Sequence, residues 1–207
     1  MGSVKDRIIK INTNTKLGRT IGSFNLPALV TCPGASAFCK KICYARKGNF
    51  CFSVVKASHA RAFEASKRED FIARAIAECS HCNMIRLHSS GDFPSISYTR
   101  KWYRIVEACP NTQFCAYTRS WVRPGIRIEL LKLSSLPNMH LFASVDDSMS
   151  GIPDSSFRKA YCHPEWRRPK DSFRCPHQVS VKKPTCTECR LCYRPPGRFN
   201  DVEFLVH

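Results

Sequence analysis

The sequence predicts an α/β fold with parallel strands, a partial (β/α) barrel followed by a cysteine-rich, loop-rich C-terminal extension. Short β-like runs alternate with helix-like segments, which is typical of a parallel sheet. A weak repeat supports this pattern, because Cys109–Ala116 resembles Leu136–Ala143 at an offset of 27 residues, close to the length of one strand–helix unit. The chain of 207 residues is short for a full eight-unit barrel of about 250 residues.

The elements follow from local patterns. One long helix is expected over residues 52–78, because this stretch lacks Gly and Pro and spaces its apolar residues helically. Further along the chain, two proline-asparagine pairs are expected to end helices. The other expected elements are strand-like runs at 24–30, 84–88, 112–117 and 139–145 and helices at 96–108 and 126–133. We place the barrel at residues 1–160 and the metal-binding extension, packed on the same domain, at 161–207.

Composition indicates one well-buried core, with 43% hydrophobic and 11% aromatic residues. No apolar run of about 18 residues and no apolar leader are visible, so we expect no membrane segment and no export. The expected location is the cytoplasm, or the host cytoplasm if the protein is viral. Thirteen cysteines, an odd number, then favour metal-binding thiols over disulfides.

The formal net charge of +17 predicts anionic partners, either nucleic acid or a phosphorylated small molecule. Residues 158–198 hold eleven basic and three acidic side chains among aromatic ones, a mixture found in proteins that bind single strands. A generally basic surface with no dedicated partner remains the alternative.

The C-terminal extension contains a C-x10-C-x2-C-x2-C pattern. Three thiolates at two-residue gaps can surround one 4Fe-4S cluster, as in bacterial ferredoxins, with a fourth reaching in from upstream. Zinc is the alternative metal, because four-thiolate zinc sites use similar short loops. The expected ligands are Cys175, Cys186, Cys189 and Cys192.

An N-terminal C-x6-C-x3-C pattern supplies only three ligands. Cys32, Cys39 and Cys43 would hold a second 4Fe-4S cluster with one iron open to substrate or a small cofactor, and Pro33 and Gly34 would let the loop fold back. A further cysteine would bind that open iron as a fourth ligand. The candidates for it are Cys51, Cys79, Cys82 and Cys162, with buried or incidental thiols as the alternative interpretation of these cysteines.

Polar residues follow each expected strand, at the edge where ligands bind in α/β sheets. Helix capping or turn formation is the alternative role for the acidic ones. The candidates for the pocket are Ser89, Ser90 and Asp92, then Thr118, Arg119 and Ser120, then Ser144, Asp146 and Asp147.

Several of these motifs together resemble a phage-encoded family, gene product 88. The resemblance covers most of residues 20–195 and is carried by SFNLPALVTCPG at 23–34, CKKICYA at 39–45, SGDF at 90–93 and CTECRLC at 186–192. It implies a viral iron-sulfur protein.

The order of the parts is also similar to that of radical S-adenosylmethionine enzymes, in which three cysteines follow the first strand of a partial barrel. This similarity implies that S-adenosylmethionine binds the open iron and that an electron donor is a partner. Those enzymes usually carry C-x3-C-x2-C, whereas this chain has wider gaps. Asp92, which follows Ser89, Ser90 and Gly91, would then bind the methionine amine of S-adenosylmethionine. Arg119 and Asp146 would bind its carboxylate and ribose.

The expected reaction is radical S-adenosylmethionine-like chemistry on a nucleotide or nucleic acid. The alternative is a protein that is not an enzyme and binds nucleic acid on a metal-stabilised surface.

Overall fold

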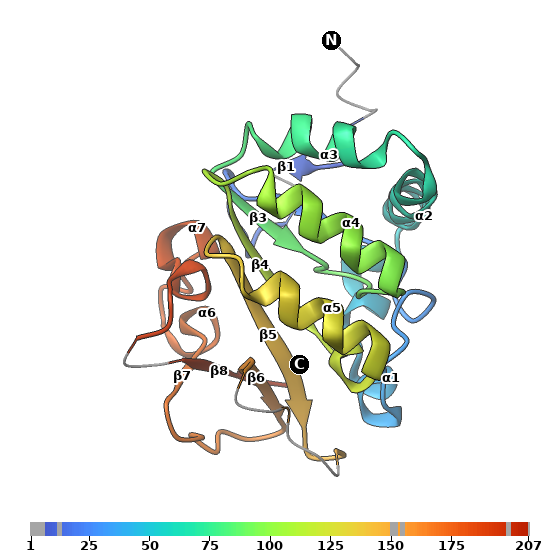
Figure 1. Cartoon of the computed structure of the whole chain (residues 1–207). Helices are drawn as coiled ribbons and strands as arrows, with labels where there is room; N and C mark the ends of the chain where they lie inside the picture. The colour runs from blue at the N-terminus through green and yellow to red at the C-terminus, as the bar shows by residue number, and fades with distance from the viewer. Residues whose placement is uncertain (1–6, 12–13, 150–152, 154–155, 198–199, 207) are drawn as a thin grey trace.

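The computed structural model describes residues 7–11, 14–149, 153, 156–197 and 200–206. Within these residues, eight strands form one sheet in the order β1-β2-β3-β4-β5-β6-β8-β7 (Figure 1). Only the pairing of β1 with β2 is antiparallel there, so the fold is mixed α/β with a mostly parallel sheet. The strands are β1 Lys10–Ile11, β2 Gly22–Phe24, β3 Met84–Leu87, β4 Gln113–Thr118, β5 Met139–Asp146, β6 Arg158–His163, β7 Ser172–Arg174 and β8 Asp201–Leu205.

The helices divide between the two faces of this sheet. Three of them, α3, α4 and α5, lie side by side on one face (Figure 1), and the short α6 and α7 belong to the C-terminal segment that follows residue 160. The α-helices are α1 Ala37–Ile42, α2 Ser53–Lys67, α3 Phe71–Cys79, α4 Ile96–Glu107, α5 Pro124–Ser134, α6 Pro176–Val179 and α7 Cys186–Cys189. The 3-10 helices are η2 Tyr44–Arg46, η3 Gly48–Cys51, η4 Ser120–Val122 and η5 Leu191–Tyr193.

The predicted strands at 84–88, 112–117 and 139–145 are confirmed as β3, β4 and β5, and the helices at 96–108 and 126–133 as α4 and α5. Alternate residues of a strand point to opposite faces. In β4, Phe114 and Ala116 join the main core beneath the helices, and Cys115 joins a second core on the other face, against which Tyr117 packs.

The single helix expected over residues 52–78 is wrong, because the chain forms α2 and α3 with a break at 68–70. Arg68 has an extended backbone, with φ −66° and ψ 155°, and its side chain pairs with Asp70. The break lets Phe71 turn inward, where it is 1% exposed and packs against Phe24 and Trp102. Burial of this ring outweighs the weak local preference for a continuous helix.

The strand expected over residues 24–30 is also shorter than predicted, since β2 ends at Phe24. Pro27 has no N–H to donate, and Leu29 has φ 66°, so the segment cannot continue as a regular strand. The side-chain oxygen of Asn25 instead accepts hydrogen bonds from the N–H groups of Ser89 and Ser90. This contact ties the chain before the first cysteine motif to the loop after β3.

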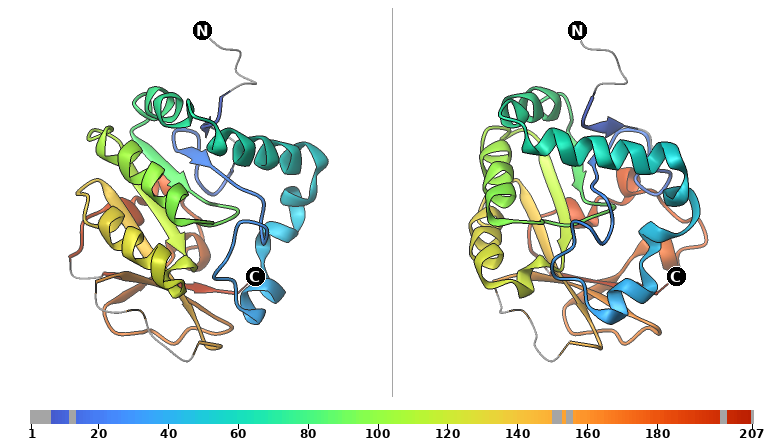
Figure 2. Two further views of the ribbon diagram at one scale, coloured as in Figure 1. Left: turned by 45° about the vertical axis from the view of Figure 1, so that its right-hand side comes forward. Right: turned by 90° about the vertical axis from the view of Figure 1, so that its right-hand side faces the viewer.

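The C-terminal segment covers the second face of the sheet, opposite α3, α4 and α5 (Figure 2). It docks on the N-terminal part of the chain, because Cys186 N–H donates to the carbonyl of Lys16 at 2.8 Å and Thr187 N–H to that of Leu17 at 3.1 Å. The boundary drawn at 160/161 falls inside β6, and the segment beyond it adds β7 and β8 to the same sheet. Among the described helices, none is long and apolar enough to cross a membrane.

Candidate functional site

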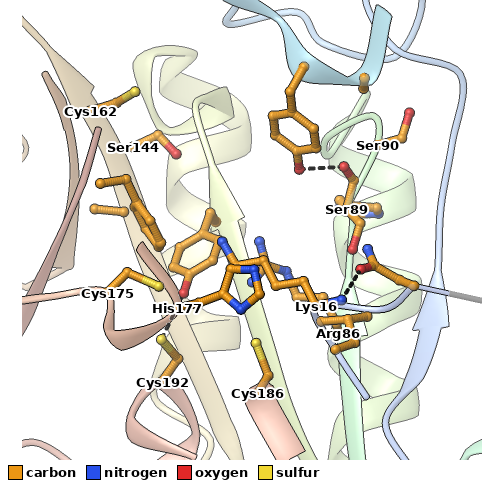
Figure 3. A pocket seen from close by; sticks show the side chains of 18 of the residues that line it. Lys16, Arg86, Ser89, Ser90, Ser144, Cys162, Cys175, His177, Cys186 and Cys192 are labelled. Carbon is orange, nitrogen blue, oxygen red and sulfur yellow. Dashed lines mark hydrogen bonds between the residues drawn. The ribbon is translucent and has the colours of Figure 1, made fainter. Parts of the chain in front are cut away.

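A cavity of about 420 Å³ opens on the second face of the sheet, where the strand ends and the C-terminal segment meet. All seven predicted cysteine ligands line it, together with Ser89, Ser90, Gly91, Asp92 and Arg119. In Figure 3, Cys175, Cys186 and Cys192 lie at one side of this cavity, with Ser89 and Ser90 across from them. Four of the pocket candidates do not line it, namely Thr118, Ser120, Asp146 and Asp147.

The first cysteine group, Cys32, Cys39 and Cys43, lies on the loop after β2 and on α1. The Ser36 side chain caps α1 by accepting from Cys39 N–H at 3.0 Å, which fixes that cysteine at the third helical position. Burial is the largest cause that raises the pKa of Cys32 to about 12, followed by the negative charge of Asp92. Cys39 and Cys43 raise this pKa further, and a backbone hydrogen bond lowers it. All three thiols line the cavity.

Gly34 lets this loop pass directly against the end of β4. A Cβ on Gly34 would lie 2.2 Å from the carbonyl oxygen of Arg119 and 2.6 Å from its carbon, and backbone atoms cannot move aside as a flexible side chain can. The glycine of the Cys-Pro-Gly motif is therefore required by close packing rather than by a left-handed conformation.

We expect Gly34→Ala to displace the first cysteine loop, lowering the free energy of unfolding by about 1–3 kcal/mol, typical of overpacking. Urea denaturation measures the loss. Gly197→Ala is the matched control, because nothing lies within 4 Å of the Cβ it would add. Equal stability of the two variants would contradict the proposed contact.

The second cysteine group, Cys175, Cys186, Cys189 and Cys192, comes from the segment after β7. A capping box between Thr185 and Glu188 starts α7, which carries Cys186 and Cys189. Arg190 then adopts a left-handed conformation at φ 55° and turns the chain so that Cys192 follows in η5. The hydroxyl of Tyr117 donates to the Cys192 sulfur at 2.8 Å, which anchors the group to the sheet.

The thiols of the second group also affect one another. Burial raises the pKa of Cys186, Arg86 and Lys16 lower it, and Cys175 and Cys189 raise it, with a net increase. The cysteines of both predicted groups line the same cavity, while their role as metal ligands stays a prediction.

Of the four cysteines considered as a further ligand of the first group, only Cys162 lines the cavity. Burial raises its pKa to about 11, and Asp146 and Cys39 add to the increase while Arg119 opposes it. Cys51 is exposed and donates to the Arg46 carbonyl, and Cys79 and Cys82 belong to the main core. In Figure 3, Cys162 lies beside Ser144 on the wall of the cavity.

Asp92 is buried within the loop that connects β3 to α4, and its carboxylate is occupied by four hydrogen bonds. It accepts hydrogen bonds from the Thr118 hydroxyl and from the N–H groups of Phe93, Arg119 and Ser120. Burial raises its pKa, and these hydrogen bonds offset part of the increase. The carboxylate thus joins the ends of β3 and β4, while its role toward a methionine amine stays a prediction.

Arg119 and Asp146 form a buried ion pair at 2.6 Å between the ends of β4 and β5. Burial raises the pKa of Asp146, but hydrogen bonds from Ser148 and Arg119 outweigh it and the net pKa is lowered. The ion pair occupies the Arg119 side chain that the sequence had assigned to a carboxylate. Their roles toward a ligand stay predictions.

Eight cysteine thiols line this cavity, beside His88, His177 and Asp92. Thiols bind soft metals such as iron in clusters and zinc. Among the described residues, no group of three or more His, Cys, Asp or Glu is arranged to hold a single metal ion.

Fold and site together define a mixed α/β protein with a cysteine-lined cavity on one face of its sheet. The chain belongs to the Gene product 88 family, whose model matches residues 4–195. It is 28% identical over 199 residues to the Gene 88 protein of Mycobacterium phage L5, covering 82% of this chain and 80% of the relative. The Gene 88 protein of Mycobacterium phage D29 is 27% identical over 190 residues, covering 78% of each chain.

These relatives support the phage origin that the sequence motifs implied. The similarity to radical S-adenosylmethionine enzymes gains no support from them. No solved structure matches the chain.

Proposed function

We propose that this protein is an iron-sulfur protein that holds two 4Fe-4S clusters in one cavity. Cys175, Cys186, Cys189 and Cys192 would bind one cluster completely, and Cys32, Cys39 and Cys43 would bind the other. The observation that carries this proposal is that two separate cysteine motifs, more than 130 residues apart, line one cavity on the same face of the sheet.

Zinc is the competing metal. A tetrahedral four-thiolate zinc site needs sulfur atoms about 3.8 Å apart, since each Zn–S bond is about 2.3 Å. A cluster holds its thiolates farther apart, because the metal atoms and sulfides of the cluster lie between them. The spacing of ligands in the sequence and the size of the cavity support the cluster.

The chemistry that we propose is radical S-adenosylmethionine-like and acts on a nucleotide or nucleic acid in the host cytoplasm. Cys32, Cys39 and Cys43 would hold the cluster that, when bound and reduced by an external electron donor, would supply the electron for cleavage of the sulfonium. In this proposal the strands form a partial barrel, and the ends of the strands surround the cavity. Ser89, Ser90 and Gly91, after β3, would orient the cofactor, and Arg119 would keep Asp146 ionised at the next strand ends.

We would reduce the protein with dithionite and record electron paramagnetic resonance with and without S-adenosylmethionine. This experiment tests whether the first cluster has an open iron that binds the cofactor. We expect the signal of the first cluster to change when the cofactor binds and 5′-deoxyadenosine to form. Both effects should be lost in Cys39→Ala, while Cys51→Ala, an exposed thiol outside the cavity, should retain them. Cofactor cleavage by Cys39→Ala would contradict the proposal.

Nucleic-acid binding without catalysis is the second candidate, supported by the net charge of +17. Affinity for single-stranded DNA or RNA should then fall steeply with salt, because each phosphate contact releases counterions. Steep salt dependence without any cofactor cleavage would favour this candidate over the enzyme.

A further inference from the structure

Arg86 is a cation placed inside the sheet, on the face that carries the cavity. In β3 the neighbours Ile85 and Leu87 are fully buried in the main core beneath the helices. Strand alternation therefore directs Arg86 to the opposite face, where it pairs in register with Ser23 of β2 and Cys115 of β4 and lines the cavity.

The guanidinium has no acidic partner among the described residues. Its Nε is shielded from solvent without a hydrogen-bond acceptor, and its carbon Cζ lies 3.8 Å from the centre of the Tyr117 ring. Burial lowers its pKa, but nearby phenols and thiols, chiefly those of Tyr117 and Cys115, outweigh this and raise it. These groups are neutral at pH 7 when they are unligated, so the positive charge is not balanced.

Burying a charge without a partner costs several kcal/mol for an ion of this size, and Arg86, which is half-buried with a shielded Nε, bears part of this cost. The cavity offers a way to balance it, because a bound anion would face the guanidinium. The nearest carboxylate in the cavity wall, that of Asp92, is already occupied by four hydrogen bonds.

An anion bound to Arg86 would lie in the cavity that both cysteine groups line. Arg86 and Lys16 line this cavity together with Tyr44, the neighbour of Cys43, and with Cys186. Figure 3 shows Lys16 and Arg86 together near Cys186.

We propose that Arg86, together with Lys16, forms a binding site for an oxyanion, the phosphate or carboxylate group of a small ligand, in the cavity that both cysteine groups line. The planar guanidinium suits both groups, because it can donate two parallel hydrogen bonds to a pair of oxygens. The inference rests on the proposed function for the assignment of the cavity as the reaction site. It names the part of that site that recognises the charged end of the substrate or cofactor.

Isothermal titration of the anaerobically purified full chain with inorganic phosphate, pyrophosphate and succinate tests the site. We expect at least one probe to bind and Arg86→Gln to weaken it about 10-fold or more, as for a lost hydrogen bond to a charged group. Arg86→Lys should restore part of the affinity. Preference for phosphate or for succinate identifies the group that the ligand carries.

Arg158→Gln is a matched control. Its guanidinium also stacks on an aromatic ring, 4.1 Å from that of Phe142, but it donates to the carbonyls of Asn200 and Arg194 and does not line the cavity. Binding should be unchanged in this variant. Thermal unfolding gives a second readout, since a bound probe should raise the midpoint of the wild type and not that of Arg86→Gln.

Two results would overturn the inference. One is the absence of binding by all three probes at millimolar concentration. The other is equal binding of the probes by wild type and Arg86→Gln. This result would overturn the inference even if the variant shifted the reduction potential of a cluster. Iron and sulfide are measured on the same samples, so a protein without iron that binds phosphate through Arg86 would refute the proposed function and uphold the oxyanion site.

Discussion

Replacing Cys43 by alanine is expected to halve the iron and acid-labile sulfide of the protein purified without oxygen, from about eight to about four of each per chain. Cys43 is one of only three thiols in the first group, so its loss leaves two ligands, too few to hold a cluster. The second group should keep its own cluster, because its four cysteines lie on a different segment that is anchored by Tyr117 and Lys16.

Two further variants make this expectation specific. Cys51→Ala removes a thiol eight residues away that is exposed and outside the cavity, and it should leave the iron unchanged. Cys189→Ala should remove the other cluster and keep the first. Full iron content in Cys43→Ala, or loss of all iron, would contradict two independent sites.

Replacing Asp92 by asparagine is expected to lower the free energy of unfolding by about 3 kcal/mol, since hydrogen bonds to charged groups contribute about 1.5–3 kcal/mol each. Four donors converge on the buried carboxylate, from Phe93, Thr118, Arg119 and Ser120. An amide in its place offers one acceptor oxygen and directs its own N–H groups toward these donors. Urea denaturation followed by circular dichroism measures the change.

Asp147→Asn is the control for this substitution. Asp147 also accepts hydrogen bonds from two side chains, His163 and Arg167, but its side chain is 34% exposed. Water can replace these partners, so the change should stay within about 1 kcal/mol. Equal losses in the two variants would show that burial of Asp92 does not decide its contribution.

Much of the fold follows from local sequence patterns. The three central strands alternate between a helix-covered core and the cavity face, and proline and asparagine end the helices between them. These features depend on residues close together in sequence, where periodicity and turn chemistry decide the structure. The cysteines of both predicted groups line one cavity, and their role as ligands stays a prediction.

The features that sequence analysis missed depend on contacts between distant segments. The shared cavity forms because α7 docks on residues 16–17, about 170 residues earlier in the chain, through backbone hydrogen bonds. No sequence motif predicts these hydrogen bonds. The break between α2 and α3 follows from burial of Phe71 against Phe24 and Trp102.

Arg86 was also missed, although the sequence carried a signal for it. A lone arginine inside the apolar run Met84-Ile-Arg-Leu87 is unusual for a central strand that is covered on both faces. Such a residue indicates a functional role when no acidic neighbour is available to pair with it.

The central claim, two iron-sulfur clusters bound by the two cysteine groups, is tested most directly by metal analysis. The full chain is purified without oxygen, and iron, acid-labile sulfide and zinc are measured per chain, with the visible spectrum recorded before and after dithionite. We expect about eight irons, about eight sulfides and a brown colour that bleaches on reduction. Colourless protein with zinc and no sulfide would contradict the claim.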